Sequence, residues 1–202
     1  MAFLEFAICL PLLLLLTVSI FEYVNYCIVR QQISQLALQV SDNAARIGTF
    51  NSVQTQIDEQ QIGDLFMGAN LQSGSLNLER NGRVILTSLE VDSAPPRGQY
   101  LHWQRCYGAL VFPSSYGREG EGKGNANVTG MGPPNARIVA LQGSPAMFVE
   151  IAYQYQPLIS ARFAPPLLIH EVAAMMVRDN RDTSDPGVNP VFGVTASKCS
   201  AV

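Results

Sequence analysis

The chain has 202 residues, the size of one ordinary domain with a small appendage, which disfavours a multidomain enzyme. Charged residues make up only 14% of the chain and hydrophobic residues 48%, a balance that argues against disorder and suggests contact with a membrane. The net charge of -3 lacks the strongly basic balance that binding to a phosphate backbone requires, so we expect no nucleic acid partner.

The first predicted element is a membrane-spanning helix. Residues 1–29 contain no Lys or Arg, and sixteen uncharged residues separate Glu5 from Glu22. Because a helix rises about 1.5 Å per residue, residues 3–26 would extend about 36 Å, enough to cross a hydrocarbon core about 30 Å thick. A cleaved signal peptide, a buried core helix and a plain membrane anchor are the alternatives; the first lacks its usual basic start. We assign residues 1–27 to the transmembrane half of this helix.

Glu5 is the unusual residue of this segment. A carboxylate four residues into an apolar helix lies at or below the headgroup boundary, where insertion costs about 2.5–3.5 kcal/mol. Such a group usually has a partner, and the nearest cation is an α-amino group. If Met1 is the mature terminus, that amine belongs to a neighbouring copy in an assembly or to the same chain one helical turn away. The sequence therefore indicates a helix that associates with other helices through Glu5.

The order of residues at the N-terminus resembles that of a known family. Glu5, Phe6 and Pro11 stand in an apolar run that continues into five leucines. This segment resembles the mature N-terminus of type IV pilins, and most closely that of the TadE-like pseudopilins of the tight-adherence (Tad) pilus. Weaker resemblance lies in residues 103–106, 153–157 and 177–182. In that family a prepilin peptidase removes a short basic leader, and we expect Met1 to be the terminus that this cut leaves.

The resemblance implies a function, partners and a location. It implies a minor pilin or pseudopilin that assembles through Met1, Glu5, Phe6 and Pro11 to initiate or cap a type IV pilus. The implied partners are other minor pilins, the major pilin, the inner-membrane assembly platform, the peptidase and membrane lipid. The chain would cross the bacterial inner membrane once, with its C-terminal domain in the periplasm or, in the pilus, outside the cell. A type II secretion pseudopilin and a membrane-anchored periplasmic binding domain stay open as alternatives.

Beyond the membrane segment, the pattern predicts an amphipathic helix. Apolar residues recur every three or four positions from Val29 to Ile47, so residues 28–50 are interpreted as the amphipathic half of the N-terminal helix. Such an apolar stripe needs a sheet to cover it. A short second helix is expected over residues 58–67, with Gly68 just past its end.

Residues 51–202 are interpreted as a periplasmic α+β domain with an antiparallel sheet. The resemblance implies that the long N-terminal helix packs on this sheet, as in a pilin. Alternating leucines before the Asn81-Gly82 pair predict a β-hairpin. Nine of the 24 residues from 113 to 136 are Gly or Pro, which indicates a long exposed loop. Further strands are expected at residues 99–110, 137–142 and 146–156, and a strand or short helix at 168–178.

The four cysteines divide into two pairs. Cys9 and Cys27 lie in or beside the apolar stretch, where free cysteine behaves as a small hydrophobe. Cys106 and Cys199 lie in the part expected in the oxidising periplasm, so we predict a disulfide between them. Two free buried thiols are the alternative.

The two histidines, His102 and His170, are interpreted as structural or surface residues. Strand alternation places His102 on the face opposite Trp103, and nearly 13 Å from Cys106, too far for a nucleophilic thiol-histidine pair. No Walker loop, no Gly-x-Ser-x-Gly elbow and no His-Glu-x-x-His motif occurs in the chain. We therefore expect that the protein is not an enzyme and binds no cofactor.

Three aspartates near the C-terminus, Asp179, Asp182 and Asp185, are the candidate metal ligands. Their spacing of three and three is not the alternating oxygen pattern of a calcium loop. We expect a solvated turn with Asp-Arg pairing at this position, and no metal.

Overall fold

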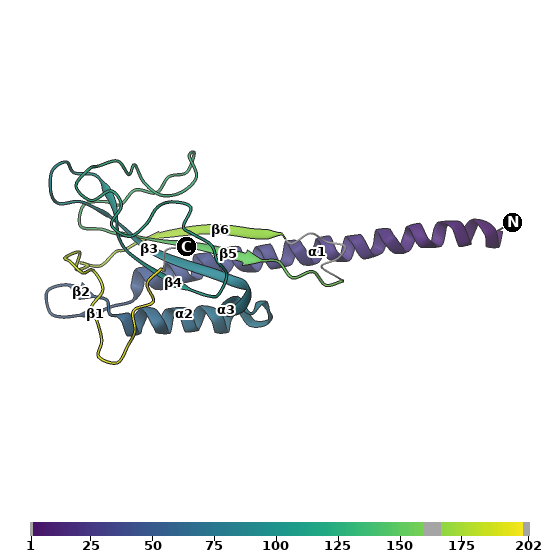
Figure 1. Cartoon of the computed structure of the whole chain (residues 1–202), viewed down its shortest axis with the longest axis horizontal. Coiled ribbons are helices and arrows are strands. Elements are labelled where there is room, and N and C mark those ends of the chain that lie inside the picture. Colours follow the sequence, from purple (N-terminus) through teal and green to yellow (C-terminus); the bar gives the residue numbers. More distant parts are fainter. Residues whose placement is uncertain (1, 160–166, 200–202) are drawn as a thin grey trace.

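The N-terminal helix α1 is the longest element of the protein. The computed structural model describes residues 2–159 and 167–199, and α1 spans Ala2–Arg46. Its first half projects from the domain, whereas its second half lies along the sheet (Figure 1). The stripe expected from the sequence is the face that packs, because the buried residues of the second half are spaced three or four apart. They include Val29, Ile33, Leu36, Val40 and Ala44.

The second helix, α2 (Glu59–Ser73), lies beside α1 (Figure 1). It begins with a capping box, in which the Asp58 carboxylate accepts from the Gln61 N–H and the Gln61 side chain accepts from the Asp58 N–H. The predicted end at Gly68 is wrong, since the helix continues to Ser73. Its buried face extends past that glycine, and this packing outweighs the roughly 1 kcal/mol that glycine costs a helix. The buried apolar residues of this face are Ile62, Leu65, Phe66 and Ala69.

Four antiparallel strands form the main sheet, in the spatial order β4-β3-β5-β6. They are β3 (Gly82–Val91), β4 (Gln99–Tyr107), β5 (Ala146–Gln154) and β6 (Leu168–Met176). α1 lies across β5 and β6. The predicted α+β class, with a long helix packed on an antiparallel sheet, is confirmed. Smaller elements are β1 (Thr49–Phe50), β2 (Thr55–Gln56), the 3-10 turn η1 (Gly74–Leu76) and α3 (Leu78–Asn81).

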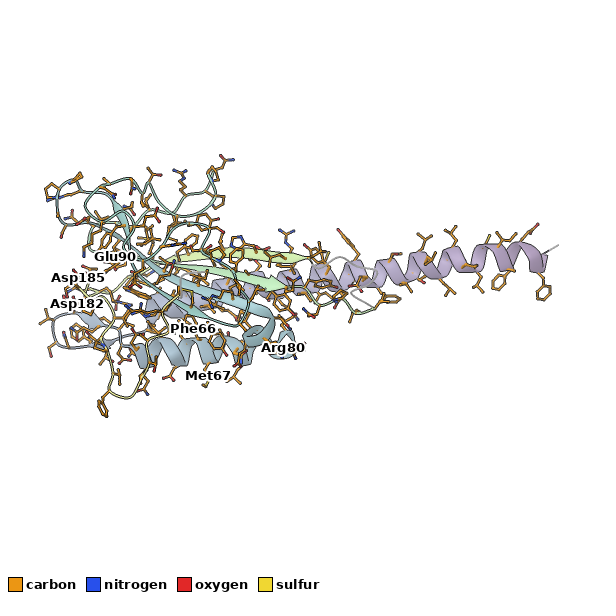
Figure 2. The ribbon with its side chains drawn as sticks, viewed as in Figure 1. Phe66, Met67, Arg80, Glu90, Asp182 and Asp185 are labelled. Atoms are coloured by element: carbon orange, nitrogen blue, oxygen red, sulfur yellow. A yellow bond between two sulfur atoms is a disulfide. The ribbon has the colours of Figure 1, made fainter. Side chains whose placement is uncertain are left out.

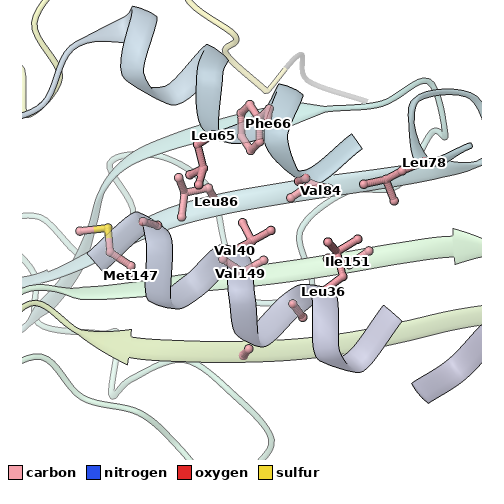
Figure 3. Close-up of a cluster of buried hydrophobic side chains, with 14 of the residues drawn as sticks. Leu36, Val40, Leu65, Phe66, Leu78, Val84, Leu86, Met147, Val149 and Ile151 are labelled. Atoms are coloured by element: carbon pink, nitrogen blue, oxygen red, sulfur yellow. The ribbon is translucent and has the colours of Figure 1, made fainter. Parts of the chain in front are cut away.

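The main core lies between the helices and the sheet (Figure 3). On the sheet side it is built from alternate residues of β3 and β5, as expected for strands with one face toward helices. On the helix side, Leu36 and Val40 come from α1, whereas Leu65 and Phe66 come from α2. Phe66 stacks on Tyr107 of β4, with ring centroids 5.7 Å apart. The sheet residues labelled in Figure 3 are Val84, Leu86, Met147, Val149 and Ile151.

The opposite face of the sheet is covered by the long connection between β4 and β5. Glu150 of β5 is fully buried there, and its carboxylate accepts hydrogen bonds from the Ser114 hydroxyl and the Ser115 N–H. A second apolar cluster joins this connection to the sheet, and Met131 is its fully buried contribution from the loop. Residues 113–136 therefore form a third layer that packs on the sheet, rather than a loop that only projects into solvent.

The predicted hairpin before β3 is wrong. Leu76 and Leu78 are both buried, but they belong to two successive helical turns and not to a strand. Asn77 between them adopts a left-handed backbone with φ 50° and ψ 60°, which reverses the chain between the turns. The Asn81-Gly82 pair then joins α3 to β3. Two leucines two residues apart fit a strand as well as two helical turns, so the local pattern cannot distinguish these two structures.

The strands predicted at 99–110 and 146–156 are present as β4 and β5, and the segment 168–178 forms the strand β6. The strand predicted at 137–142 is wrong. That segment forms only isolated bridges, from Ile138 to Met131 and from Leu141 to Ser144. Its alternating apolar residues pack on the face of the sheet instead of pairing at an edge, as Ile138 does in the second cluster.

A β-bulge interrupts β4 at His102. Ser88 of β3 pairs with Trp103, and Leu89 pairs with Leu101, which leaves His102 as the extra residue. The prediction that His102 and Trp103 face opposite sides is therefore wrong. Both side chains approach Gly187, where an added Cβ would lie 2.9 Å from His102 Cε1 and 2.5 Å from Trp103 Cδ1.

Candidate assembly interface

The first half of α1 presents an uncovered apolar surface. Within residues 2–159 and 167–199, α1 is the one helix long and apolar enough to cross a membrane, and its most apolar stretch has no residue buried within the protein. A surface this long and apolar requires lipid or other helices around it. Its exposed large side chains include Phe3, Phe6, Ile8, Leu12, Leu15 and Ile20.

The polar side chains of this half suit an apolar surrounding. The Thr17 hydroxyl donates to the Leu14 carbonyl at 2.9 Å, and the Ser19 hydroxyl donates to the Leu15 carbonyl at 2.8 Å. Both hydroxyls are thus satisfied within the helix, as hydrocarbon requires of a polar group. Pro11 lies inside the helix and has no N–H to donate.

The residues predicted to direct assembly lie at one end of α1. Glu5 is in the first turn and exposed, and Phe6 beside it is 59% exposed. Met1 lies outside the described residues. The first basic side chain of the sequence, Arg30, is 25 residues further along, or about 38 Å at the rise of a helix. At that distance along one continuous helix, Arg30 cannot pair with Glu5.

Glu22, near the middle of α1, binds the sheet domain. Its carboxylate accepts a 2.6 Å hydrogen bond from the Tyr155 hydroxyl and longer ones from the backbone N–H groups of Leu158 and Ile159. Asn25 donates to the same hydroxyl at 2.7 Å. Burial and the Glu22 carboxylate raise the pKa of Tyr155 to about 12, so its phenol stays protonated. In the sequence, Glu22 marks only the end of the apolar run, because the residues that bind its carboxylate lie 133 or more positions away.

The C-terminal segment is tied to β4 by the predicted disulfide. Cys106 and Cys199 are bonded, with their Cα atoms 4.9 Å apart, and the Cys106 N–H donates to the Ser197 carbonyl. Cys9 and Cys27 are free and exposed on α1. Because the sulfur of Cys106 is in the disulfide, it is not a free thiol for a nucleophilic pair with His102.

A charged cluster holds the same C-terminal segment at the end of the domain away from the N-terminus (Figure 2). His102 is buried, with Nδ1 3.0 Å from a Glu90 oxygen and Nε2 3.1 Å from an Asp185 oxygen. Lys123 of the long loop pairs with Asp185 at 2.9 Å. The cluster therefore joins β3, β4, the loop and the C-terminal segment.

The other two aspartates of this segment have separate partners. Asp179 pairs with Arg181 at 3.4 Å, which agrees with the Asp-Arg pairing expected from the sequence. Asp182 accepts from Ser184 and from Gln56 of β2. In the part of the chain that the structure describes, no group of three or more His, Cys, Asp or Glu residues is placed to hold a metal ion.

Arg105 and Glu59 form a buried ion pair that the sequence analysis did not identify. Both side chains are 5% exposed, and two guanidinium nitrogens of Arg105 on β4 contact the Glu59 carboxylate at the start of α2. The available signal was a charged residue within the segment 99–110, which was expected to form a strand of the sheet. A buried charge of this kind needs a partner, but the sequence does not indicate which.

The N-terminal segment matches one known family. Residues 1–47 match the family described as TadE-like protein, a stretch that covers all of α1. No curated protein and no solved structure matches the chain. The resemblance indicated by Glu5, Phe6 and Pro11 is thereby confirmed for the helix that carries them.

Proposed function

We propose that this protein is a minor pilin of a Tad-type pilus, which assembles through the first half of α1 to initiate or cap the fibre. The observation that carries the proposal is the uncovered apolar surface of α1, in the segment that matches the TadE-like family. Its proposed partners are other minor pilins, the major pilin and the assembly platform of the inner membrane. We propose no catalytic activity.

The mechanism is the exchange of lipid for neighbouring helices. In the inner membrane, lipid surrounds the first half of α1 while the sheet domain lies on the periplasmic side. On assembly, the helices of other pilins replace that lipid and cover Phe6 and its neighbours. The Glu5 carboxylate is then neutralised by the α-amino group of Met1 of an adjoining subunit. The positive end of the helix dipole adds about 0.3–1 kcal/mol for a negative side chain in the first turn.

Replacement of Glu5 by Ala tests this mechanism. Glu5→Ala removes the charge that selects a neighbouring terminus, and we expect co-purification with partner pilins to fall about tenfold, which corresponds to about 1.4 kcal/mol. The fold should not change, because Glu5 is exposed and lies in the half of α1 that projects from the domain (Figure 1). Thr17→Ala, on the same exposed half of α1, is the matched control and should keep wild-type association. Undiminished association of Glu5→Ala would contradict the proposal.

A second experiment separates assembly from simple anchoring. Residues 1–27 are replaced with an unrelated transmembrane helix that lacks an acidic residue in its first turn. A pilin should lose incorporation into the fibre while its sheet domain stays at the membrane. If incorporation survives the exchange, the helix is only a tether and the protein is an anchored periplasmic domain.

A further inference from the structure

The end of the sheet domain that faces the first half of α1 is itself apolar. One segment leaves β5 and carries Leu158 and Ile159, which are 66% and 48% exposed. A second segment enters β6 and carries Leu167 and Leu168, which are 42% and 47% exposed. Both segments lie at the end of the domain from which α1 projects (Figure 1). These four side chains are called the apolar rim.

The apolar rim lies at one level along α1. The backbone N–H groups of Leu158 and Ile159 bind the Glu22 carboxylate, and the Tyr155 hydroxyl binds the same group. Leu167 belongs to this level because its carbonyl accepts from the Tyr155 N–H at 2.9 Å. Around the same turns, α1 exposes further large apolar side chains. These are Phe21, Tyr23 and Val24.

The length of α1 from Ala2 to Glu22 matches the thickness of the hydrocarbon core of a membrane. Ala2 and Glu22 are twenty residues apart in one continuous helix, which corresponds to about 30 Å and so to the hydrocarbon core of a bilayer. If the first half of α1 spans the membrane, Glu22 therefore lies at the outer edge of the core. The next charged residue of the helix, Arg30, is about 12 Å further out and pairs with Glu171 of β6 at 2.9 Å.

The sheet domain is held at a fixed position along α1, at the height of Glu22. The second half of α1 is buried against β5 and β6, with Ile33 fully enclosed, so the helix and the sheet move as one unit. The three hydrogen bonds to Glu22 hold the segment after β5 against the helix. An anchor with a flexible connection would allow the domain to move away from the lipid, but this helix is continuous across the boundary.

We propose that the apolar rim is a second membrane contact, which rests in the interfacial layer of the bilayer beside α1. This inference rests on the proposed membrane-spanning role of α1. Exposed leucine and isoleucine side chains at the level of the headgroups gain from transfer into the acyl boundary, and Tyr23 is of the residue type enriched there. The rim sets the height and tilt of the domain on the membrane before assembly.

Depth-dependent quenching tests this contact in the full chain. A fluorescent bimane label is attached at Leu158→Cys or at Leu168→Cys in a background of Cys9→Ser and Cys27→Ser, which leaves the Cys106-Cys199 disulfide intact. The chain is placed in nanodiscs of phosphatidylcholine and phosphatidylglycerol at one copy per disc. Quenchers are a lipid with a nitroxide near the headgroup end of its acyl chain, and aqueous iodide. Leu71→Cys on α2 is the matched control, because that leucine is 77% exposed and its neighbours Gln72 and Ser73 share a hollow with residues 32–39 of α1, at least ten positions beyond Glu22.

We expect labels on the apolar rim to be quenched several-fold more by the nitroxide lipid, and several-fold less by iodide, than the label at position 71. Equal access of iodide to the positions 158 and 71 would overturn the inference. Protection at position 158 that appears only when several copies share a disc would also overturn it, because a neighbouring subunit and not lipid would then cover the rim.

A label at Leu12→Cys separates failure of this inference from failure of the proposed function. If the lipid quenches position 12 but not position 158, α1 spans the membrane and only the rim contact is wrong. If the lipid quenches neither position, α1 is not a membrane helix, and both the proposed function and this inference fail.

Discussion

His102 is the residue in which local geometry most clearly controls ionisation. Burial favours the neutral ring, but the carboxylates of Glu90 and Asp185, one on each ring nitrogen, raise the pKa of His102 above its usual value. Tyr100 packs beside the ring, and Lys123 pairs with the same Asp185. His102 therefore joins the C-terminal segment to β3 and β4 through these two carboxylates.

The raised pKa predicts a loss of stability at higher pH. A group whose pKa is higher in the folded state than in the unfolded chain contributes stability below its ordinary value of about 6.5 and loses it as pH rises through the folded value. We expect the free energy of unfolding to fall as the pH rises above about 6.5, measured by chemical denaturation with Trp103 fluorescence. His102→Asn should be less stable at pH 6 and should show a flatter pH profile. A profile with the wild-type slope in that variant would assign the dependence to another group.

At the scale of elements, the two halves of α1 differ in what surrounds them. In the second half, Leu36 is 4% exposed and Leu38, two residues later, is 53% exposed, whereas the leucines at positions 12–16 of the first half are all exposed. The side chain of Leu36 belongs to the core between the helices and the sheet (Figure 3). The stability of the second half of α1 therefore depends on one face.

This difference gives a matched pair of substitutions. Leu36→Ala should lower the free energy of unfolding by about 2–5 kcal/mol, because it removes buried methyl groups and leaves a cavity. Leu38→Ala has the same chemistry at an exposed position and should change it by less than about 0.5 kcal/mol. Denaturation of the full chain in nonionic detergent measures both values. Equal losses in the two variants would mean that the second half of α1 does not pack as described.

At the scale of the whole molecule, the C-terminal segment closes one edge of the sheet. It crosses β4, where the backbone of Lys198 forms an isolated antiparallel β-bridge with that of Arg105. The disulfide between Cys106 and Cys199 closes a loop of 93 residues. A cross-link of this separation restricts the unfolded chain strongly, and a loop of about this length corresponds to roughly 4 kcal/mol.

Removal of both partners tests this contribution. Cys106→Ala together with Cys199→Ala should lower the free energy of unfolding by roughly 4 kcal/mol, measured against the wild type without reductant. Cys9→Ser together with Cys27→Ser is the control and should leave stability unchanged, since both residues are free and exposed on α1. If a reductant destabilises the control but not the double alanine variant, the disulfide is the source of the effect. A double alanine variant as stable as the wild type would contradict the prediction.

Local patterns were sufficient for the long helix, for its uncovered apolar half and for most strands. The stripe from Val29 to Ala44 and the apolar run before it are features of sequence spacing, which a helix converts directly into a face. The proposed assembly residues Glu5, Phe6 and Pro11 could be placed on one helix for the same reason, because their order along a helix is their arrangement in space. The cysteine pair followed from which half of the chain each member occupies.

Only the tertiary structure decided the features that depend on distant partners. The turns at Leu76 and Leu78 replace a hairpin because both leucines find the core between α2 and the sheet, and the bulge at His102 exists only relative to β3. The contact of Glu22 with residues 155–159 spans more than 130 positions. Spacing along the chain specifies a face, but the partner of that face is set by packing among all the elements, and no local pattern contains it.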